Sequence, residues 1–72
     1  MVDNELPHLT PRERQAALLA LEYLPIKAIA ARMGISYRSA GYLLFKIRRK
    51  LEAQCYAEMV VRLLAWRDQL EL

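Results

Sequence analysis

Gly34 and Ser36 separate two short amphipathic stretches, and this arrangement constrains the fold more than any other feature of the sequence. From Ile26 to Met33 apolar residues recur every three or four positions, which predicts a helix of about two turns. Gly34 readily takes the left-handed conformation that ends a helix, and Ser36 is a preferred N-cap for a helix beginning at Tyr37. Two helices joined by so short a turn cross steeply, as in a helix-turn-helix.

Helical patterns also occupy the chain on both sides of this pair. Thr10 can cap a preceding helix, Pro11 suits its first position, and Glu13 completes a capping box. No run alternates with period two, so no strand is expected. The prediction is an all-α fold with four helices, at about 11–23, 26–33, 37–51 and 54–70.

The size of the chain argues against catalysis. Seventy-two residues make one small domain, with little room for a deep cleft beside the core. We find no nucleophile with a base, no paired carboxylates and no phosphate-binding glycine loop, so we expect no enzyme. Cys55 and His8 are single, which excludes an internal disulfide and a structural zinc site, and no metal or cofactor is expected.

Two further features bear on location. The longest apolar run, 16–21, is far shorter than the roughly 20 residues that cross a bilayer, so no membrane association is expected. Residues 1–10 have neither the basic nor the apolar part of a signal peptide. The sequence therefore predicts a cytoplasmic protein, with a loosely ordered tail at 1–8 and a single domain at 9–72.

Positive charge is concentrated in the middle of the chain. The formal net charge is +3, yet no acidic residue occurs between Tyr23 and Leu51. Such a segment attracts a polyanion, and nucleic acid is the most common one. The basic residues of this window are Lys27, Arg32, Arg38, Lys46, Arg48, Arg49 and Lys50.

The predicted helix at 37–51 divides into two faces. A stripe from Ala40 to Leu51 is apolar at helical spacing and should face the core. The opposite face carries the residues that could enter the major groove of double-stranded DNA, while Phe45 could equally be a half-buried core residue. The candidates for contacts with base edges are Arg38, Tyr42 and Lys46. The candidates for contacts with the DNA backbone are Lys27, Ser36, Tyr37, Arg48, Arg49 and Lys50.

The predicted last helix is more apolar than one small core needs. Apolar residues make up 56% of the chain even without glycine, against about 45–50% with glycine in average domains. One interpretation is a homodimer interface made by Met59, Leu63, Trp66 and Leu70; the other is that these residues complete the core of a single chain. Two-fold pairing would set two recognition helices about 34 Å apart on an inverted-repeat site.

Three segments resemble the LuxR/GerE-type DNA-binding domain: Leu9-Thr10-Pro11-Arg12-Glu13-Arg14, Lys27-Ala28-Ile29-Ala30-Ala31-Arg32-Met33-Gly34-Ile35-Ser36 and Ile47-Arg48-Arg49-Lys50-Leu51. The similarity runs from residue 9 to about 66, and the C-terminal part looks most like the short stand-alone GerE-type regulators of bacteria. The resemblance implies four helices, of which the second and third bind DNA and the fourth dimerises. Sigma-factor region 4 shares the first half of the pattern, whereas the apolar fourth helix favours the LuxR/GerE type.

Two departures from that family affect the predicted recognition helix. Gly41 stands where the family has a DNA-facing lysine, and Leu43 stands where it has a histidine. After that helix, Glu52-Ala53 stands where the family often has a glycine that ends the third helix, so the resemblance implies a weaker break than usual between the third and fourth helices. The first hypothesis is a homodimeric transcription regulator that inserts the helix at 37–51 into the major groove. The alternative is a helix-turn-helix fold that has become a protein-interaction module, an antiactivator of a larger regulator or a partner of RNA polymerase.

Overall fold

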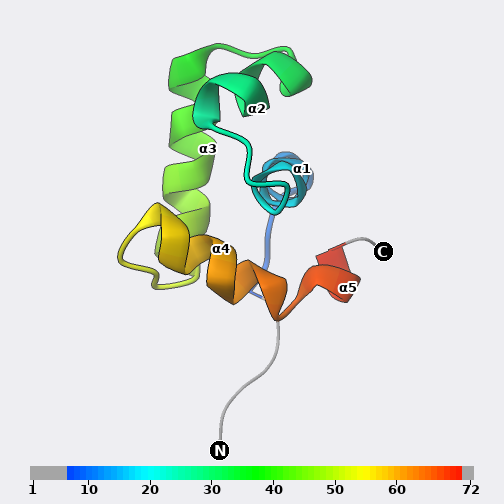
Figure 1. The fold of residues 1–72 in the computed structure, drawn as a ribbon, viewed down its shortest axis with the longest axis vertical. Helices are drawn as coiled ribbons and strands as arrows, with labels where there is room; N and C mark the ends of the chain where they lie inside the picture. The colour runs from blue at the N-terminus through cyan, green and yellow to red at the C-terminus, as the bar shows by residue number, and fades with distance from the viewer. Residues whose placement is uncertain (1–6, 71–72) are drawn as a thin grey trace, which may run out of the picture.

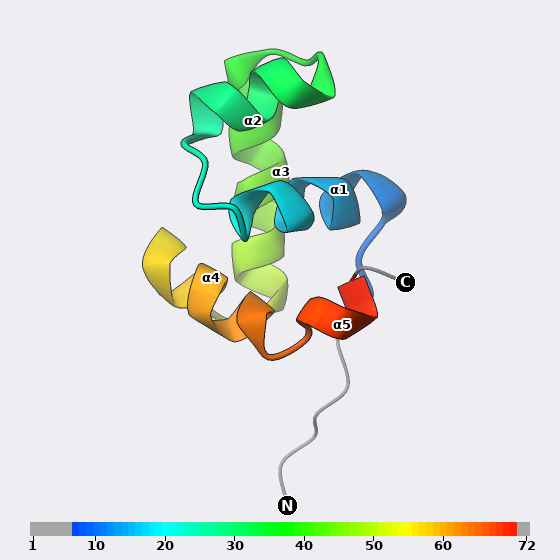
Figure 2. The same ribbon diagram turned by 45° about the vertical axis from the view of Figure 1, so that its right-hand side comes forward.

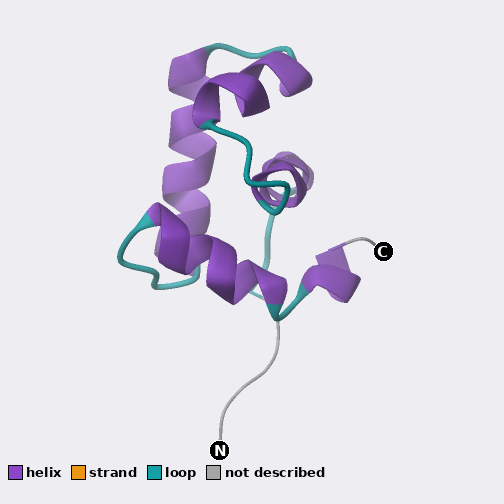
Figure 3. Ribbon diagram, in the orientation of Figure 1, coloured by secondary structure: helices purple, strands orange, loops and turns teal. Residues whose placement is uncertain are grey.

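A computed structural model describes residues 7–70, and these residues form five helices and no strand. The long helix α3 spans one side of the molecule, with α2 across its beginning, α4 across its end and α1 packed between them (Figures 1 and 3). Figure 2 shows the short helix α5 returning beneath α1. The all-α prediction is confirmed. The helices are α1 (Pro11–Ala20), α2 (Ile26–Met33), α3 (Tyr37–Lys50), α4 (Tyr56–Leu64) and α5 (Arg67–Leu70).

The helix-turn-helix forms where the sequence predicts it, for the predicted reasons. The Thr10 hydroxyl accepts a hydrogen bond from the Glu13 N–H, and the Glu13 carboxylate accepts one from the Thr10 N–H, which completes the capping box of α1. Gly34 ends α2 with φ of 68°. Ser36 caps α3 by accepting a hydrogen bond from the Ser39 N–H at 3.0 Å. The turn between α2 and α3 is therefore held at both ends.

Two helix ends differ from the prediction. Helix α1 ends at Ala20 rather than near Tyr23, because the chain turns through Tyr23 with φ of 60°. Between α3 and α4 the chain breaks fully: Glu52 has φ of 57°, and the Ala53 N–H donates to the Arg48 carbonyl at 3.0 Å. This is a Schellman-type ending with glutamate at the position that glycine usually takes. The expectation of a weak break at Glu52 was wrong.

The predicted single helix at 54–70 is two helices. After Leu64 the N–H groups of Ala65 and Trp66 bond to carbonyls three residues back, at 3.2 and 2.9 Å, so the helix tightens and ends. Helix α5 then changes direction and brings Leu70 into contact with the core beside α1. The apolar spacing of this region is therefore satisfied by a bent pair of helices within one chain.

Three of the four residues predicted at a dimer interface lie in the core of a single chain. Met59 and Leu63 are fully buried, Leu70 is 1% exposed, and Trp66 is half-buried against the same core. Their apolar character is explained without a second copy, which is the alternative that the sequence left open. On α4 the large apolar side chains that are exposed are instead Val61 and Leu64.

The N-terminal tail predicted at 1–8 lies mostly outside the described residues, which begin at Pro7. The carbonyl of His8 accepts a hydrogen bond from Lys50 Nζ at 3.0 Å, so the backbone at this point is attached to α3. None of the helices within 7–70 is both long enough and apolar enough to span a bilayer.

Candidate nucleic-acid interface

The outward face of α3 carries the largest exposed side chains near the helix-turn-helix. Tyr37 and Tyr42 are 63% and 61% exposed, and Phe45 is 44% exposed. Arg38 and Arg49 share this face and are exposed. Ser36 fixes the beginning of α3, and the buried stripe Ala40, Leu44 and Ile47 holds the opposite side against the core. The predicted division of this helix into two faces is therefore observed.

Some of the predicted DNA-contacting cations are free to bind an external anion. Among the described residues, neither Arg38 nor Lys27 has an ion-pair partner or a side-chain hydrogen bond, and both are exposed. Arg49 is exposed as well, with its guanidinium 5.8 Å from the centre of the Phe45 ring. A contact of that length leaves the donors of Arg49 available to a phosphate.

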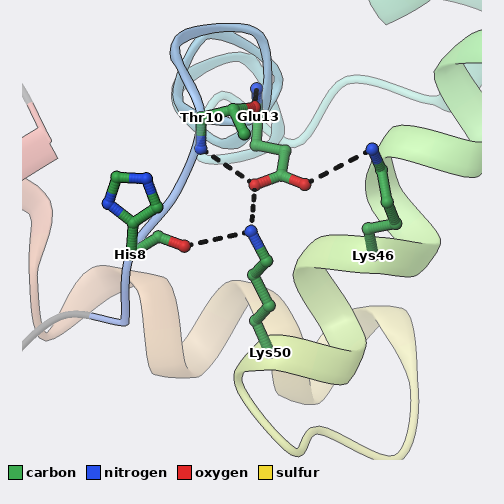
Figure 4. A network of polar contacts seen from close by, with 5 residues as sticks. All are labelled: His8, Thr10, Glu13, Lys46 and Lys50. Atoms are coloured by element: carbon green, nitrogen blue, oxygen red, sulfur yellow. Dashed lines mark hydrogen bonds and ion pairs between the residues drawn. The ribbon is translucent and has the colours of Figure 1, made fainter.

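Lys46 and Lys50, by contrast, are attached to a buried carboxylate. Glu13, only 1% exposed, projects from α1 toward α3 and lies between the two ammonium groups (Figure 4). Lys50 Nζ is 2.7 Å from Glu13 Oε1, and Lys46 Nζ is 3.6 Å from Glu13 Oε2. Burial alone would raise the pKa of Glu13, but the hydrogen bonds from Lys50 and Thr10 and the two positive charges hold that pKa below its ordinary value.

This network changes the role of Lys46, which the sequence placed among the base-edge candidates. Its side chain is half-buried, and its ammonium group is paired with Glu13 and lies 4.8 Å from the centre of the Tyr42 ring. Reaching a base edge would require breaking the ion pair with Glu13, whereas Arg38 and Tyr42, the other two base-edge candidates, are exposed. Lys50, a backbone candidate, is likewise committed to Glu13 and His8.

Arg48 is also used within the protein. Its guanidinium donates to the carbonyls of Ala53 and Gln54, at 3.2 and 3.5 Å, and so ties the end of α3 to the loop before α4. It also lies 5.4 Å from the centre of the Phe45 ring. Arg48 therefore contributes its positive charge near the surface, while its hydrogen bonds serve the fold.

Two hollows flank the outward face of α3. The one beside α4 is almost entirely apolar, and Gly41 forms part of its wall; a Cβ at Gly41 would meet nothing within 4 Å. It is lined by Ile26, Gly41, Leu44, Phe45, Arg48, Tyr56 and Met59.

The hollow beside the beginning of α1 is more polar and includes Arg12, which the sequence did not single out. Only the packing of α1 against α3 brings Arg12 to this side, so no local pattern could have found it. It is lined by Thr10, Arg12, Ile35, Ser39, Tyr42, Leu43 and Lys46.

No metal site is visible in the part of the chain that the structure describes: no three histidine, cysteine, aspartate or glutamate side chains gather there as ligands would. Cys55 is exposed and unbridged. The chemistry of this surface is therefore that of cations, hydroxyl groups and aromatic rings.

The family model described as Sigma-70, region 4 matches residues 1–51. The matched segment contains α1, α2 and α3, while α4 and α5 follow it. Searches of the curated proteins and of the solved structures found no match. The match is to the family that shares the first half of the sequence pattern; the finer LuxR/GerE-type assignment stays a prediction.

Proposed function

Since the chain belongs to the Sigma-70 region 4 family, we propose that it is a transcription regulator that reads the major groove with the first half of α3. Sigma-70 region 4 is a helix-turn-helix module that binds DNA. In such modules the recognition helix places its N-terminal residues against base edges. Arg38 and Tyr42 occupy these positions here.

The observation that carries the proposal is the exposed side chain of Arg38 at the beginning of α3, which has no ion pair or side-chain hydrogen bond within residues 7–70. An arginine can donate two hydrogen bonds to O6 and N7 of a guanine, the most common specific contact in the major groove. Lys27 and Arg49, before and after Arg38 along the chain, are exposed cations without an ion pair among residues 7–70, and they are suited to phosphates. The hydroxyl group of Tyr37 lies at the same end of α3 and can donate to a phosphate oxygen, whereas the Ser36 hydroxyl already donates to Ser39 Oγ.

The test is to select duplexes from a random pool with the pure protein and to measure their affinity by fluorescence anisotropy at several salt concentrations. We expect an enriched motif and a steep loss of affinity with salt. Arg38→Ala should remove the preference for that motif, while Arg67→Ala, which removes an exposed cation from α5, should keep it. If the protein binds none of the duplexes even at low salt, the proposal is refuted.

The proposal includes a homodimer, with an interface that differs from the one predicted from sequence. Ala57, Val61 and Leu64 lie at helical spacing on α4 and are exposed, which leaves an apolar strip suited to a second copy. Pairing there would favour an inverted-repeat site. We expect sedimentation to show a dimer that Val61→Glu dissociates. Arg62→Glu, a charge change at the neighbouring position of α4, should affect the dimer less. A wild-type protein that is monomeric and selects a single half-site would contradict the dimer.

A second function is favoured by the apolar hollow beside Phe45. Sigma region 4 also contacts proteins, and Phe45, which is 44% exposed, lines this hollow together with Gly41. A protein-interaction module, with RNA polymerase or a larger regulator as partner, would use this hollow. It predicts binding to RNA polymerase that Phe45→Ser abolishes while duplex binding by the same variant persists.

A further inference from the structure

Four exposed side chains of α3 form one stripe. They recur at spacings of four, three and four residues, so they project within about 60° of one another around the helix axis. On the opposite side of the helix Ala40, Leu44 and Ile47 are buried, so the whole stripe faces away from the core. Its first and last members are arginines and its middle two are aromatic: Arg38, Tyr42, Phe45 and Arg49.

Phe45 is the member of this stripe that has no hydrogen-bonding group. Its side chain is 44% exposed, whereas Leu44 beside it in the sequence is 4% exposed, so the ring is not needed to fill the core. The guanidinium groups of Arg48 and Arg49 lie 5.4 and 5.8 Å from the centre of the ring, and α3 contains no acidic residue. Such surroundings attract a chain of phosphates, so DNA bound to α3 meets this ring.

The ring is also held in place before any ligand arrives. It lines the apolar hollow together with Met59. Arg48, which lies against the ring, is fixed by hydrogen bonds to the carbonyls of Ala53 and Gln54. Because a side chain that is already ordered loses little conformational entropy on binding, Phe45 is suited to a contact that selects among ligands.

The length of α3 between Arg38 and Phe45 places the ring beside a base pair. The two residues are seven positions apart, which is about 10 Å along the helix, or the length of about three base pairs. The residues of a homeodomain helix that read bases span about the same number of positions. When Arg38 bonds to a guanine, Phe45 therefore faces a base edge about three pairs away.

One feature of the major groove suits an apolar ring. Adenine, guanine and cytosine present hydrogen-bonding atoms there, and a phenyl ring would displace water from these atoms without replacing its hydrogen bonds. Thymine presents a methyl group beside its O4 acceptor, and burial of that methyl group against the ring is favourable.

We infer that Phe45 is a specificity-determining residue that selects thymine, through its 5-methyl group, about three base pairs from the guanine read by Arg38. The inference rests on the proposed function and extends the reading surface into the second half of α3. It gives Phe45 a different role from the protein contact of the second function, under which duplex binding would not depend on this ring.

The test removes the methyl group alone. Each thymine of the selected duplex is replaced in turn by deoxyuridine, and the affinity is measured by fluorescence anisotropy. We expect one thymine at which the wild type binds the deoxyuridine duplex about fourfold more weakly, as burial of one methyl group predicts, while Phe45→Ala binds both duplexes equally. At that position the wild type should also bind 5-methylcytosine about fourfold more tightly than cytosine. Both affinities are measured on the same protein sample, so a smaller folded fraction of Phe45→Ala does not change their ratio.

Tyr37→Ala is the matched control, since it removes another exposed aromatic ring of α3 that lies off the stripe. It should weaken binding to both duplexes and keep the fourfold ratio. Phe45→Leu, which retains a large apolar side chain, should keep most of the ratio.

Three results would overturn the inference while the proposed function stands, because the selected duplex is still bound and Arg38→Ala still loses the preference. They are a selected motif without thymine, equal binding of the thymine and deoxyuridine duplexes by the wild type at every position, and a ratio that Phe45→Ala keeps. If the wild type binds no duplex at all, the proposed function fails, and the thymine contact with it.

Discussion

The two halves of α3 differ in how many cations they carry and in how many of those cations are available to an external anion. The first half contains one cation, Arg38, which is exposed and has no partner among residues 7–70. The second half contains four, and three of them are engaged inside the protein: Lys46 and Lys50 by Glu13, and Arg48 by backbone carbonyls. The more basic half is thus the half that holds the fold together.

This difference teaches that a count of basic residues measures charge but not free donors. Glu13 determines which lysines of α3 remain available to an external ligand, although it lies more than 30 residues before Lys46, because its buried carboxylate pairs with them. A buried carboxylate is tolerated only where it is paired, and two lysines of α3 supply the pairing. The second half keeps its positive charge, but Lys46, Arg48 and Lys50 already have partners within the protein.

Removal of the Glu13 charge should have the largest effect on stability. Glu13→Gln leaves Lys46 and Lys50 without a counter-charge, and we expect a loss of about 2 kcal/mol in the free energy of unfolding. The value lies below that of a fully buried pair because both lysines are half-exposed and water can solvate them. Urea unfolding measures it.

Glu58→Gln is the matched control, since it removes an exposed ion pair with Arg62 of the same 2.7 Å length as the contact between Lys50 and Glu13. We expect a clearly smaller loss there, because water solvates both partners of an exposed ion pair. Equal losses in the two variants would show that burial of Glu13 contributes nothing, and the contrast between the two halves of α3 would lose its physical basis.

Local sequence signals predicted the helix-turn-helix well, because each signal acts within a few residues. Thr10, Gly34 and Ser36 begin or end helices through bonds to neighbours three to five positions away. The bend after Leu64 had no such signal, since neither glycine nor proline stands at 65–66 and the apolar spacing fits one helix or two. There the packing of Leu70 beside α1 decides the path of the chain.

The candidate site was predicted only in part, for the same reason. The exposure of Arg38 and Tyr42 follows from their place on one helix, which periodicity reveals. The capture of Lys46 by Glu13 and the approach of Arg12 to α3 depend on how α1 docks. Contacts between elements distant in sequence leave no periodic trace, so they could not be predicted from the pattern.

Replacement of Arg38 should affect mainly DNA binding, and replacement of Arg48 should affect mainly the stability of the fold. Arg38→Ala removes a free guanidinium, and we expect a loss of about 1–3 kcal/mol in binding to the selected duplex with unchanged unfolding. Arg48→Ala removes hydrogen bonds to Ala53 and Gln54, and should lower the free energy of unfolding by about 1 kcal/mol with a smaller effect on binding. Anisotropy and urea unfolding on both variants test this, and the reverse pattern would overturn the comparison.

Gly41 lies in the first half of α3, and its replacement should stabilise the protein. Alanine favours a helix interior over glycine by about 0.5–1 kcal/mol, and an added Cβ would meet nothing within 4 Å. Gly41→Ala should therefore raise the melting temperature, as calorimetry would show, with duplex binding kept. Loss of DNA binding in a stabilised variant would indicate that the DNA backbone approaches α3 at Gly41, and would extend the binding surface toward the α4 side.

The pH dependence should give the smallest effect, since burial opposes the lowering of the Glu13 pKa and leaves a modest net shift. The folded pKa lies below the ordinary value of 4.5, so the ionised carboxylate stabilises the protein above that pH. This contribution is lost as the pH falls through the folded pKa, because the protonated acid no longer pairs with Lys46 and Lys50. Urea unfolding of the wild type and Glu13→Gln between pH 7 and pH 3 measures it. The difference between the two proteins should be full at pH 7 and shrink below about pH 4.5, whereas a difference independent of pH would mean that the shape of the side chain, rather than its charge, connects α1 to the second half of α3.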